Sequence, residues 1–146
     1  MVDKTFLHWP FFGDEHRDVR LRLKEFISRE LCAVDYGNID QACKKLVSAL
    51  GEANFLIYTG DPTGKLDVRT LCLIRETLAY HDGLADFSFA MQGLGSGAIS
   101  LYGSEEQKQE WLTKTRNGKA IAAFALTEPQ SGSDVANSTM TAIKDG

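Results

Sequence analysis

The residues best suited to chemistry lie together in the stretch TEPQSGSDVAN, which covers positions 127–137. Ser131 and Ser133 beside Asp134 resemble a hydrolase nucleophile with its acid. Such a nucleophile also needs a histidine base and normally stands in a Gly-x-Ser-x-Gly turn. No glycine stands two residues before Ser131, and all three histidines of the chain precede the loop. The sequence therefore disfavours a serine hydrolase.

A cradle for an anion fits the same loop better. The residues around Gly132 can turn several backbone N–H groups and the Ser133 hydroxyl toward one anion, and a glycine lets that anion come close. In the apolar run before the loop, Phe124 and Leu126 share one side of an extended chain. The Thr127 hydroxyl can then reach polar atoms on the edge of a flat ring. A ring system together with a diphosphate indicates a dinucleotide ligand.

Two carboxylates, Glu128 and Asp134, flank this cradle. Acidic side chains in loops commonly accept hydrogen bonds from nearby backbone N–H groups, and this capping role is the favoured interpretation of both residues. Direct participation in chemistry is the alternative.

The residues before the loop predict five helices, because apolar side chains recur at three- and four-residue steps between charged ones. Asn38 and Asp67 are the expected N-cap residues of the second and third helices. Ser104 opens a capping box for the fifth, in which Trp111 and Leu112 are expected to face inward. The five helices are predicted over residues 14–31, 38–51, 67–82, 84–102 and 104–117.

The fourth of these segments, LADFSFAMQGLGSGAISLY, contains glycines at positions 93, 95 and 97. Each glycine costs a helix about 1 kcal/mol relative to alanine, so three of them need a reason. Close approach of another helix is one explanation, and close approach of a ligand is the other. The segment alone favours neither.

The pattern changes after the fifth helix. AIAAFALT, positions 120–127, is an apolar run of strand length, and STMTAIK, positions 138–144, has the composition of a second strand. The Asp145-Gly146 pair that follows is a strong signal for a two-residue hairpin turn. Because one or two strands do not form a stable sheet, we expect this chain to be the front part of a longer protein or to need other chains.

The composition of the 146 residues predicts a soluble globular domain, with a formal net charge of -4 and no basic stripe that could bind a nucleic acid. The longest apolar run is too short to span a membrane, and no signal or transit peptide is visible, which indicates a cytoplasmic protein of bacterial type. The cysteines at positions 32, 43 and 72 are predicted to be buried thiols. Neither the cysteines nor the histidines have metal-ligand spacing, so no metal site is predicted.

The loop and its surroundings also resemble a known family. ALTEPQSGSDVAN, positions 125–137, is similar to the flavin-binding signature of the acyl-CoA dehydrogenases: a small residue, an aliphatic one, Thr or Ser, Glu, and two residues later small-Gly-Ser/Thr-Asp. Asn137 departs from the signature, which prefers Gly, Ala or Ser there. GSEEQKQEWL and the glycine-containing helix resemble the segments that precede this signature in the family, and WPFFGDEHR resembles its bacterial members.

The resemblance implies a mainly α fold: an up-down helical N-terminal domain at residues 1–119, followed at 120–146 by the first strands and the flavin-binding loop of an incomplete middle β domain. It implies FAD as the cofactor. It also implies that Ser133 meets the bound thioester and that the glycine-containing helix forms a wall of the acyl pocket. The cofactor-binding residues would be Phe124, Leu126, Thr127, Gly132 and Ser133, and the pocket residues Met91, Gln92 and Leu94.

In this family a carboxylate removes the α proton of an acyl-CoA while the β hydride passes to the flavin, which yields the trans-2,3-enoyl-CoA. The base usually comes from a C-terminal bundle with no counterpart in these 146 residues, so the resemblance implies no catalytic residue in this chain and no turnover by it alone. An electron-transfer flavoprotein would accept the electrons, and the complete protein would be a homodimer or homotetramer. A flavin oxidase or monooxygenase of the same fold, and a non-catalytic helical binding module, are the alternatives.

Overall fold

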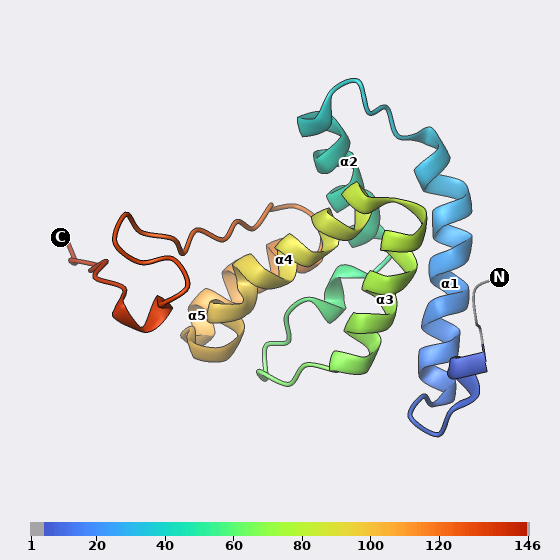
Figure 1. Ribbon diagram of the computed structural model, residues 1–146, viewed down its shortest axis with the longest axis horizontal. Coiled ribbons are helices and arrows are strands. Elements are labelled where there is room, and N and C mark those ends of the chain that lie inside the picture. Colours follow the sequence, from blue (N-terminus) through green and yellow to red (C-terminus); the bar gives the residue numbers. More distant parts are fainter. Residues whose placement is uncertain (1–4, 146) are drawn as a thin grey trace.

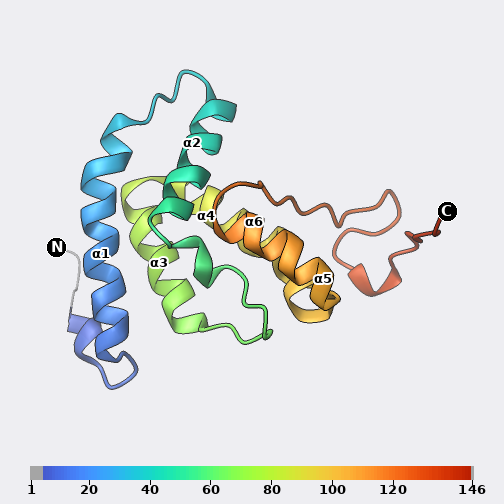
Figure 2. The same cartoon turned by 180° about the vertical axis from the view of Figure 1, so that it is seen from behind.

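The computed structural model describes residues 5–145 and shows a helical body from which an extended arm leads away (Figure 1; Figure 2). We call residues 5–119 the helical body and residues 120–145 the arm. A π-helical turn, Lys108–Leu112, joins the last two α-helices into one helical stretch, so all five predicted helices are present and the mainly α prediction is confirmed. The α-helices are α1 (Asp14–Glu30), α2 (Ile39–Glu52), α3 (Val68–His81), α4 (Gly83–Tyr102), α5 (Glu105–Gln107) and α6 (Thr113–Arg116).

Side-chain caps start these helices where the sequence predicts them. The Asn38 side chain accepts a hydrogen bond from a backbone N–H in the first turn of α2, and Asp67 does the same for α3. Ser104 opens the predicted capping box of α5. Asp82 ends α3 and caps α4, so the two helices follow each other without a loop. Because the first helical turn leaves its N–H groups without partners, these acceptors define the helix starts locally.

The apolar core lies among the four long helices. The inner face of α3 packs against α1 and α4, and α2 packs against α4 (Figure 1). The rings of Phe26 on α1 and Phe55 after α2 meet edge to face, with 5.4 Å between their centroids. Burial of apolar side chains from all four helices supplies the main stabilisation of the body. The buried cluster includes Val19, Leu23, Phe26, Ile27, Leu46, Val47, Leu50, Phe55, Leu56, Ile74, Leu78 and Phe89.

The prediction that the cysteines are buried is wrong for two of the three. Cys32 and Cys72 are exposed, and Cys43 is half-buried. Cys72 lies on the side of α3 opposite the inward-facing residues at 70, 73, 74, 77 and 78, because successive helical residues are rotated by about 100°. The thiol of Cys32 follows α1 and donates to the carbonyl of Ser28 at 3.3 Å. Helical position therefore outweighs the usual preference of cysteine for the interior.

The inward orientation predicted for Trp111 is also wrong. Its side chain is 44% exposed, whereas its neighbour Leu112 is buried. Adjacent side chains on a helix point in different directions, so Leu112 takes the inward position and Trp111 flanks it. The indole ring then lies 4.7 Å from the ammonium nitrogen of Lys114. Such a cation–π contact suits a ring at the surface.

The predicted strands do not form in the arm as far as the structure describes it. Residues 120–127 are extended, but their backbone has no partner strand, and the Ala122 N–H donates instead to the Gln92 side chain at 2.7 Å. An extended segment becomes a strand only when a second backbone completes its hydrogen bonds. The backbone pairing in the described arm is a single antiparallel bridge between Glu128 and Ser131. The predicted turn includes residue 146, which lies outside the described residues.

Candidate functional site

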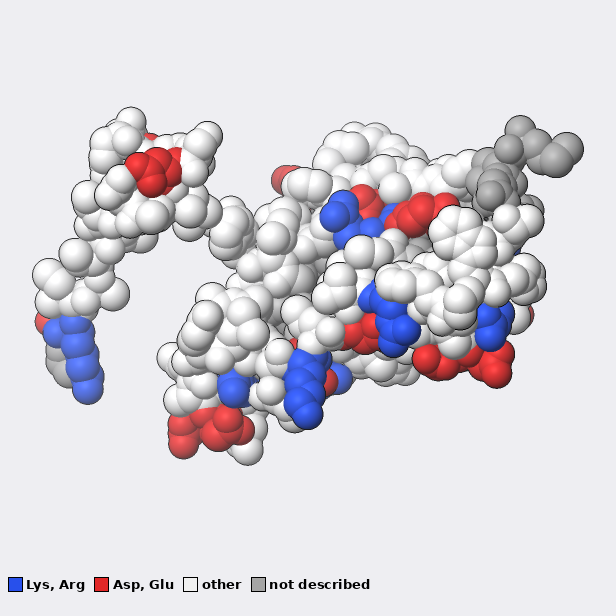
Figure 3. Space-filling view, turned by 60° about the horizontal axis from the view of Figure 1, so that its bottom comes forward, with Lys and Arg blue, Asp and Glu red and all other residues white. Residues whose placement is uncertain are grey.

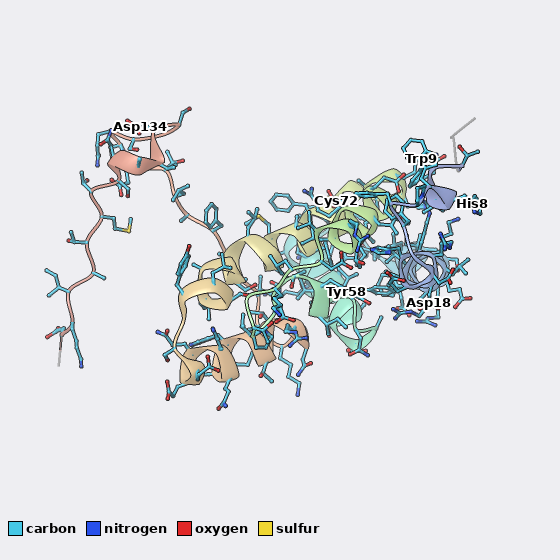
Figure 4. All side chains as sticks on the ribbon, turned by 90° about the horizontal axis from the view of Figure 1, so that it is seen from below. His8, Trp9, Asp18, Tyr58, Cys72 and Asp134 are labelled. Atoms are coloured by element: carbon cyan, nitrogen blue, oxygen red, sulfur yellow. The ribbon has the colours of Figure 1, made fainter. Side chains whose placement is uncertain are left out.

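The predicted anion cradle lies in the arm, away from the helical body. Figure 4 shows Asp134 in the arm, well separated from Trp9 on the body. A backbone bridge closes the loop at its base: the Glu128 N–H donates to the carbonyl of Ser131 at 2.9 Å, and the Ser131 N–H donates back at 3.1 Å. A short 3-10 helix, Val135–Asn137, completes the turn. Residues of the arm itself therefore define the shape of the loop.

The Glu128 carboxylate holds the two ends of this loop together. It accepts hydrogen bonds from the backbone N–H groups of Thr139 and Met140 at 2.8 and 2.9 Å. The Ser138 hydroxyl and the Gln130 side-chain amide donate to the same carboxylate. The hydrogen bond from Ser138 and those from the two backbone N–H groups lower the pKa of Glu128 to about 2. The capping interpretation of Glu128 is therefore confirmed, and the ionised carboxylate is its structural form.

We expect the order of this loop to depend on pH through Glu128. Because the pKa is lower in the folded loop than the ordinary value of about 4.3, the stabilisation is complete above that value. It should be lost as the pH falls from about 4.3 through the folded pKa of about 2. Titration of the Glu128 carboxyl carbon by NMR, together with the amide signals of Thr139 and Met140, measures this directly. A Glu128 pKa near the ordinary carboxyl value would contradict the role of Glu128 in holding the loop. The same conclusion would follow if the Thr139 and Met140 amide signals changed with pH in the same way in Glu128→Gln.

The open edge of the cradle is formed by Gly132 and Ser133, which are both exposed. A Cβ atom at Gly132 would meet no other atom within 4 Å, so a ligand can approach the backbone there. Ser131, by contrast, is buried, and its hydroxyl donates to the carbonyl of Asp134. Ser131 is therefore part of the internal structure of the loop, and its hydroxyl is not positioned beside a base as a hydrolase nucleophile requires.

The residues predicted to meet the cofactor ring lie directly before the cradle. Phe124 is 49% exposed and Leu126 is 43% exposed, and Thr127 is exposed as well. The backbone is extended here (Figure 1), so Phe124 and Leu126 fall on the same side of the chain. An apolar edge, a hydroxyl and an open cradle thus follow one another along the arm. Contact of these residues with a flavin stays a prediction.

Gln92, predicted to line the acyl pocket, has a different place in the structure. Its side chain is fully buried on α4, with 0% exposure. The side-chain NH2 donates to the carbonyl oxygens of Thr115 and Ala120 at 3.1 and 2.9 Å, and the side-chain oxygen accepts from the Ala122 N–H at 2.7 Å. These bonds tie the end of α6 and the start of the arm to α4. The structure therefore gives Gln92 a positioning role, and its contact with a substrate stays untested.

The other two predicted pocket residues lie at the surface of α4. Met91 is half-buried, and Leu94 is exposed and lines a cavity of about 260 Å³ between α4, α3 and the segment before α3. Arg75 also lines this cavity, and its guanidinium donates to both carboxylate oxygens of Asp86 at 2.9 and 2.7 Å. The rest of the cavity wall comes from separate segments of the chain, so no single sequence motif could have predicted it. It consists of Thr59, Leu66, Leu71, Phe89, Ala90 and Gly93.

The glycines of α4 have different surroundings. A Cβ atom at Gly95 would lie 2.6 Å from the backbone nitrogen of Ala123, so this glycine lets the arm cross closely over the helix. A Cβ at Gly93 would come no closer than 3.4 Å to Thr59, and one at Gly97 would meet nothing within 4 Å. Close approach of the arm, and not of a second helix, therefore accounts for Gly95. The open surface at Gly97 remains available to a ligand.

This difference predicts opposite effects of the same substitution on one helix. Gly95→Ala should lower the free energy of unfolding by about 1–3 kcal/mol, because the added methyl group displaces the backbone of the arm. Gly97→Ala should raise it by about 1 kcal/mol, because alanine favours the helix and finds open space. Urea unfolding followed by circular dichroism compares the two variants. Equal effects of the two substitutions would show that the arm does not rest on Gly95.

Two classes of feature are absent from the part of the chain that the structure describes. Residues 5–145 contain no group of three His, Cys, Asp or Glu side chains placed to hold a metal ion. None of the described helices combines the length and the apolar character needed to cross a membrane.

On the face shown in Figure 3, acidic and basic side chains are interspersed over the helical body.

The helical body defines the class of protein. The family described as "Acyl-CoA dehydrogenase, N-terminal domain" matches residues 13–119, which is well over half of the chain. This chain therefore belongs to the acyl-CoA dehydrogenase family, and its matched part is the helical N-terminal domain of that family.

Similar proteins carry names from the same family. A "Probable acyl-CoA dehydrogenase" of Bacillus subtilis is 30% identical over 138 residues, which are 90% of this chain and 23% of that protein. Another protein named as a probable acyl-CoA dehydrogenase, from Mycobacterium leprae, is 29% identical over 139 residues, 91% of this chain and 36% of that protein. A mitochondrial very long-chain specific acyl-CoA dehydrogenase of Rattus norvegicus is 42% identical over 71 residues, 48% of this chain and 11% of that protein. This chain thus spans only a minor part of each relative.

Proposed function

We propose that this chain supplies cofactor-binding and acyl-pocket residues of an FAD-dependent dehydrogenase that converts an acyl-CoA into the trans-2,3-enoyl-CoA. The observation that carries the proposal is the loop at 128–140. The Glu128 carboxylate, at one end of this loop, accepts hydrogen bonds from backbone N–H groups at the other end. Gly132 and Ser133 form an open edge with room for an anion. A loop ordered in advance loses little entropy when a ligand binds.

The residues of the arm fit the two chemically different parts of FAD. The backbone N–H groups and hydroxyl at Gly132 and Ser133 suit the diphosphate, which carries negative charge. The exposed faces of Phe124 and Leu126 suit the flat isoalloxazine ring. The Thr127 hydroxyl donates to the edge of that ring, where negative charge grows on reduction. When bound, FAD supplies the acceptor for the hydride from the β carbon of the substrate.

On the substrate side, Ser133 also faces the thioester, and Met91 and Leu94 contribute to the acyl pocket beside the cavity on α4. Gln92 holds α4 against the arm and so positions the pocket relative to the cradle. The base that removes the α proton is supplied by a part of the protein outside these residues. An electron-transfer flavoprotein accepts the electrons, and the complete protein is a cytoplasmic homodimer or homotetramer.

A chimera tests this proposal. In it, this chain replaces the matching residues of the Bacillus subtilis relative, whose remaining length supplies the rest of the protein. We expect the purified chimera to show flavin absorbance and to be bleached by an acyl-CoA when an electron-transfer acceptor is absent. The chain by itself should retain FAD weakly or not at all.

The outcomes of this experiment separate the alternatives. A folded chimera without flavin absorbance would contradict the proposal and favour a non-catalytic module. A yellow chimera that passes its electrons to oxygen faster than to the electron-transfer acceptor would favour an oxidase or monooxygenase of the same fold.

A further inference from the structure

A cavity with a volume of about 460 Å³ lies in the groove between α1 and α3 of the helical body. The two helices lie side by side, and the arm is at the other end of the molecule in both views (Figure 1; Figure 2). Volumes in this range accommodate small organic ligands. Each helix presents four residues to the cavity: Arg20, Lys24, Ile27 and Ser28 from α1, and Glu76, Thr77, Tyr80 and His81 from α3.

Arg20 is the unusual member of this wall, because it is a buried cation that lacks hydrogen-bond acceptors. Its residue is only 6% exposed, and neither Nε nor Nη1 has a hydrogen-bond partner among residues 5–145. The nearest carboxylate oxygen, Oε2 of Glu76, lies 3.5 Å from Nη1, which is too far for a good hydrogen bond. The ring of Phe6 lies 5.2 Å from the guanidinium carbon but offers no oxygen. Buried guanidinium groups normally pair with planar acceptors such as carboxylates.

The other residues that line the cavity favour a ligand that joins an anionic group to an apolar part. Ile27 and the ring of Tyr80 are apolar surfaces, and the Lys24 side chain adds an ammonium group that has no ion-pair partner in the described part of the chain. The Ser28 and Thr77 hydroxyls already donate to backbone carbonyl oxygens of their own helices. The cavity therefore offers two cations and apolar walls, and the Glu76 carboxylate on the same wall disfavours the larger negative charge of a phosphate.

We propose that the groove between α1 and α3 binds a small organic carboxylate, with the anionic group on Arg20 and Lys24 and the apolar body against Ile27 and Tyr80. The Glu76 carboxylate lies on the same wall and competes with the ligand for Arg20. His81 lines the opening on α3 and is already in edge contact with the ring of Tyr80, with centroids 5.1 Å apart. This site is separate from the predicted flavin cradle in the arm.

Titration of the chain with para-fluorobenzoate, followed by fluorine NMR, tests the site. We expect saturable binding with a Kd of about 1 mM or tighter. The neutral analogue para-fluorobenzamide should bind about tenfold more weakly or worse, because it cannot form the charged pair with Arg20. Inorganic phosphate should not displace the benzoate. Equal binding of the amide, displacement by phosphate, or no saturable binding at all would each overturn the proposal.

Substitutions locate the binding. Glu76→Gln should strengthen para-fluorobenzoate binding by about threefold or more, because it removes the competing negative charge from the wall. Arg20→Met should weaken binding by about tenfold or more, and Arg29→Met, at an exposed position outside this cavity, is the matched control. If Arg20→Met does not fold, the Glu76→Gln result decides, since this variant keeps the volume of the side chain. Unchanged or weaker binding by Glu76→Gln would place the ligand elsewhere.

Discussion

Replacing Gln92 by Leu is expected to lower the free energy of unfolding by about 2–4 kcal/mol, although leucine is more apolar and the site is fully buried. The Gln92 side chain is hydrogen-bonded to the carbonyl oxygens of Thr115 and Ala120 and to the N–H of Ala122. Leucine fills much of the same volume but leaves the Ala120 carbonyl and the Ala122 N–H without partners. The Thr115 carbonyl still accepts from the Gly118 N–H at 3.1 Å. A buried backbone group that loses its partner costs more than a typical hydrogen bond contributes.

Urea unfolding measures this effect, and the amide signal of Ala122 shows whether the arm has left α4. Gln109→Leu is the matched control, because Gln109 is exposed on the helical stretch 105–116 and the same change there should alter stability by no more than about 0.5 kcal/mol. If the two leucine variants were equally stable, the arm would not depend on Gln92 for its position.

The second large effect concerns the open edge of the cradle. In the chimera, Gly132→Val is expected to weaken FAD binding by about tenfold or more, because the branched side chain fills the space where the diphosphate approaches the backbone. The folded loop itself should tolerate the change. A Cβ atom at this position meets no atom within 4 Å, and the backbone does not adopt the left-handed conformation that favours glycine.

Fluorescence titration with FAD measures the affinity, and the amide signals of Thr139 and Met140 report whether their hydrogen bonds to Glu128 persist. Glu128→Gln should weaken FAD binding less than Gly132→Val, since the Glu128 carboxylate bonds within the loop and we expect it not to touch the ligand. Gln109→Ala, at an exposed position on the helical body away from the cradle, should have the smallest effect. Equal losses in all three variants would mean that the diphosphate binds elsewhere.

Local signals in the sequence predicted the helices well, because the groups that decide a helix start lie within one turn of each other. Asn38, Asp67 and Ser104 cap helices where they were expected to. The family resemblance was equally local, since the signature at 125–137 is a continuous stretch. The predicted capping role of Glu128 is confirmed as well, but its partners at 138–140 come ten to twelve residues later, so local spacing could not identify them.

Orientation was harder to predict, and α4 shows why. The outward side of this helix includes Phe87, Leu94 and Tyr102, all exposed, whereas its inner face is mostly small and polar. The Ser100 hydroxyl on that inner face donates to the carbonyl of Asp61, which is 39 residues away in sequence. The Ser96 hydroxyl bonds within its own helix, but the Ser100 bond needs a backbone group that is distant in sequence, and no periodicity of apolar residues can indicate that.

Local patterns in the sequence predicted the helical segments, their caps and the family, since each depends on residues close together in the chain or on a continuous motif. The tertiary structure decided which side of each segment is buried. It showed Gln92 to be a buried anchor, left Trp111 at the surface, assigned Gly95 to the crossing of the arm and set Arg20 beside a cavity. These roles depend on contacts between segments far apart in sequence, and such contacts exist only once the helices have packed.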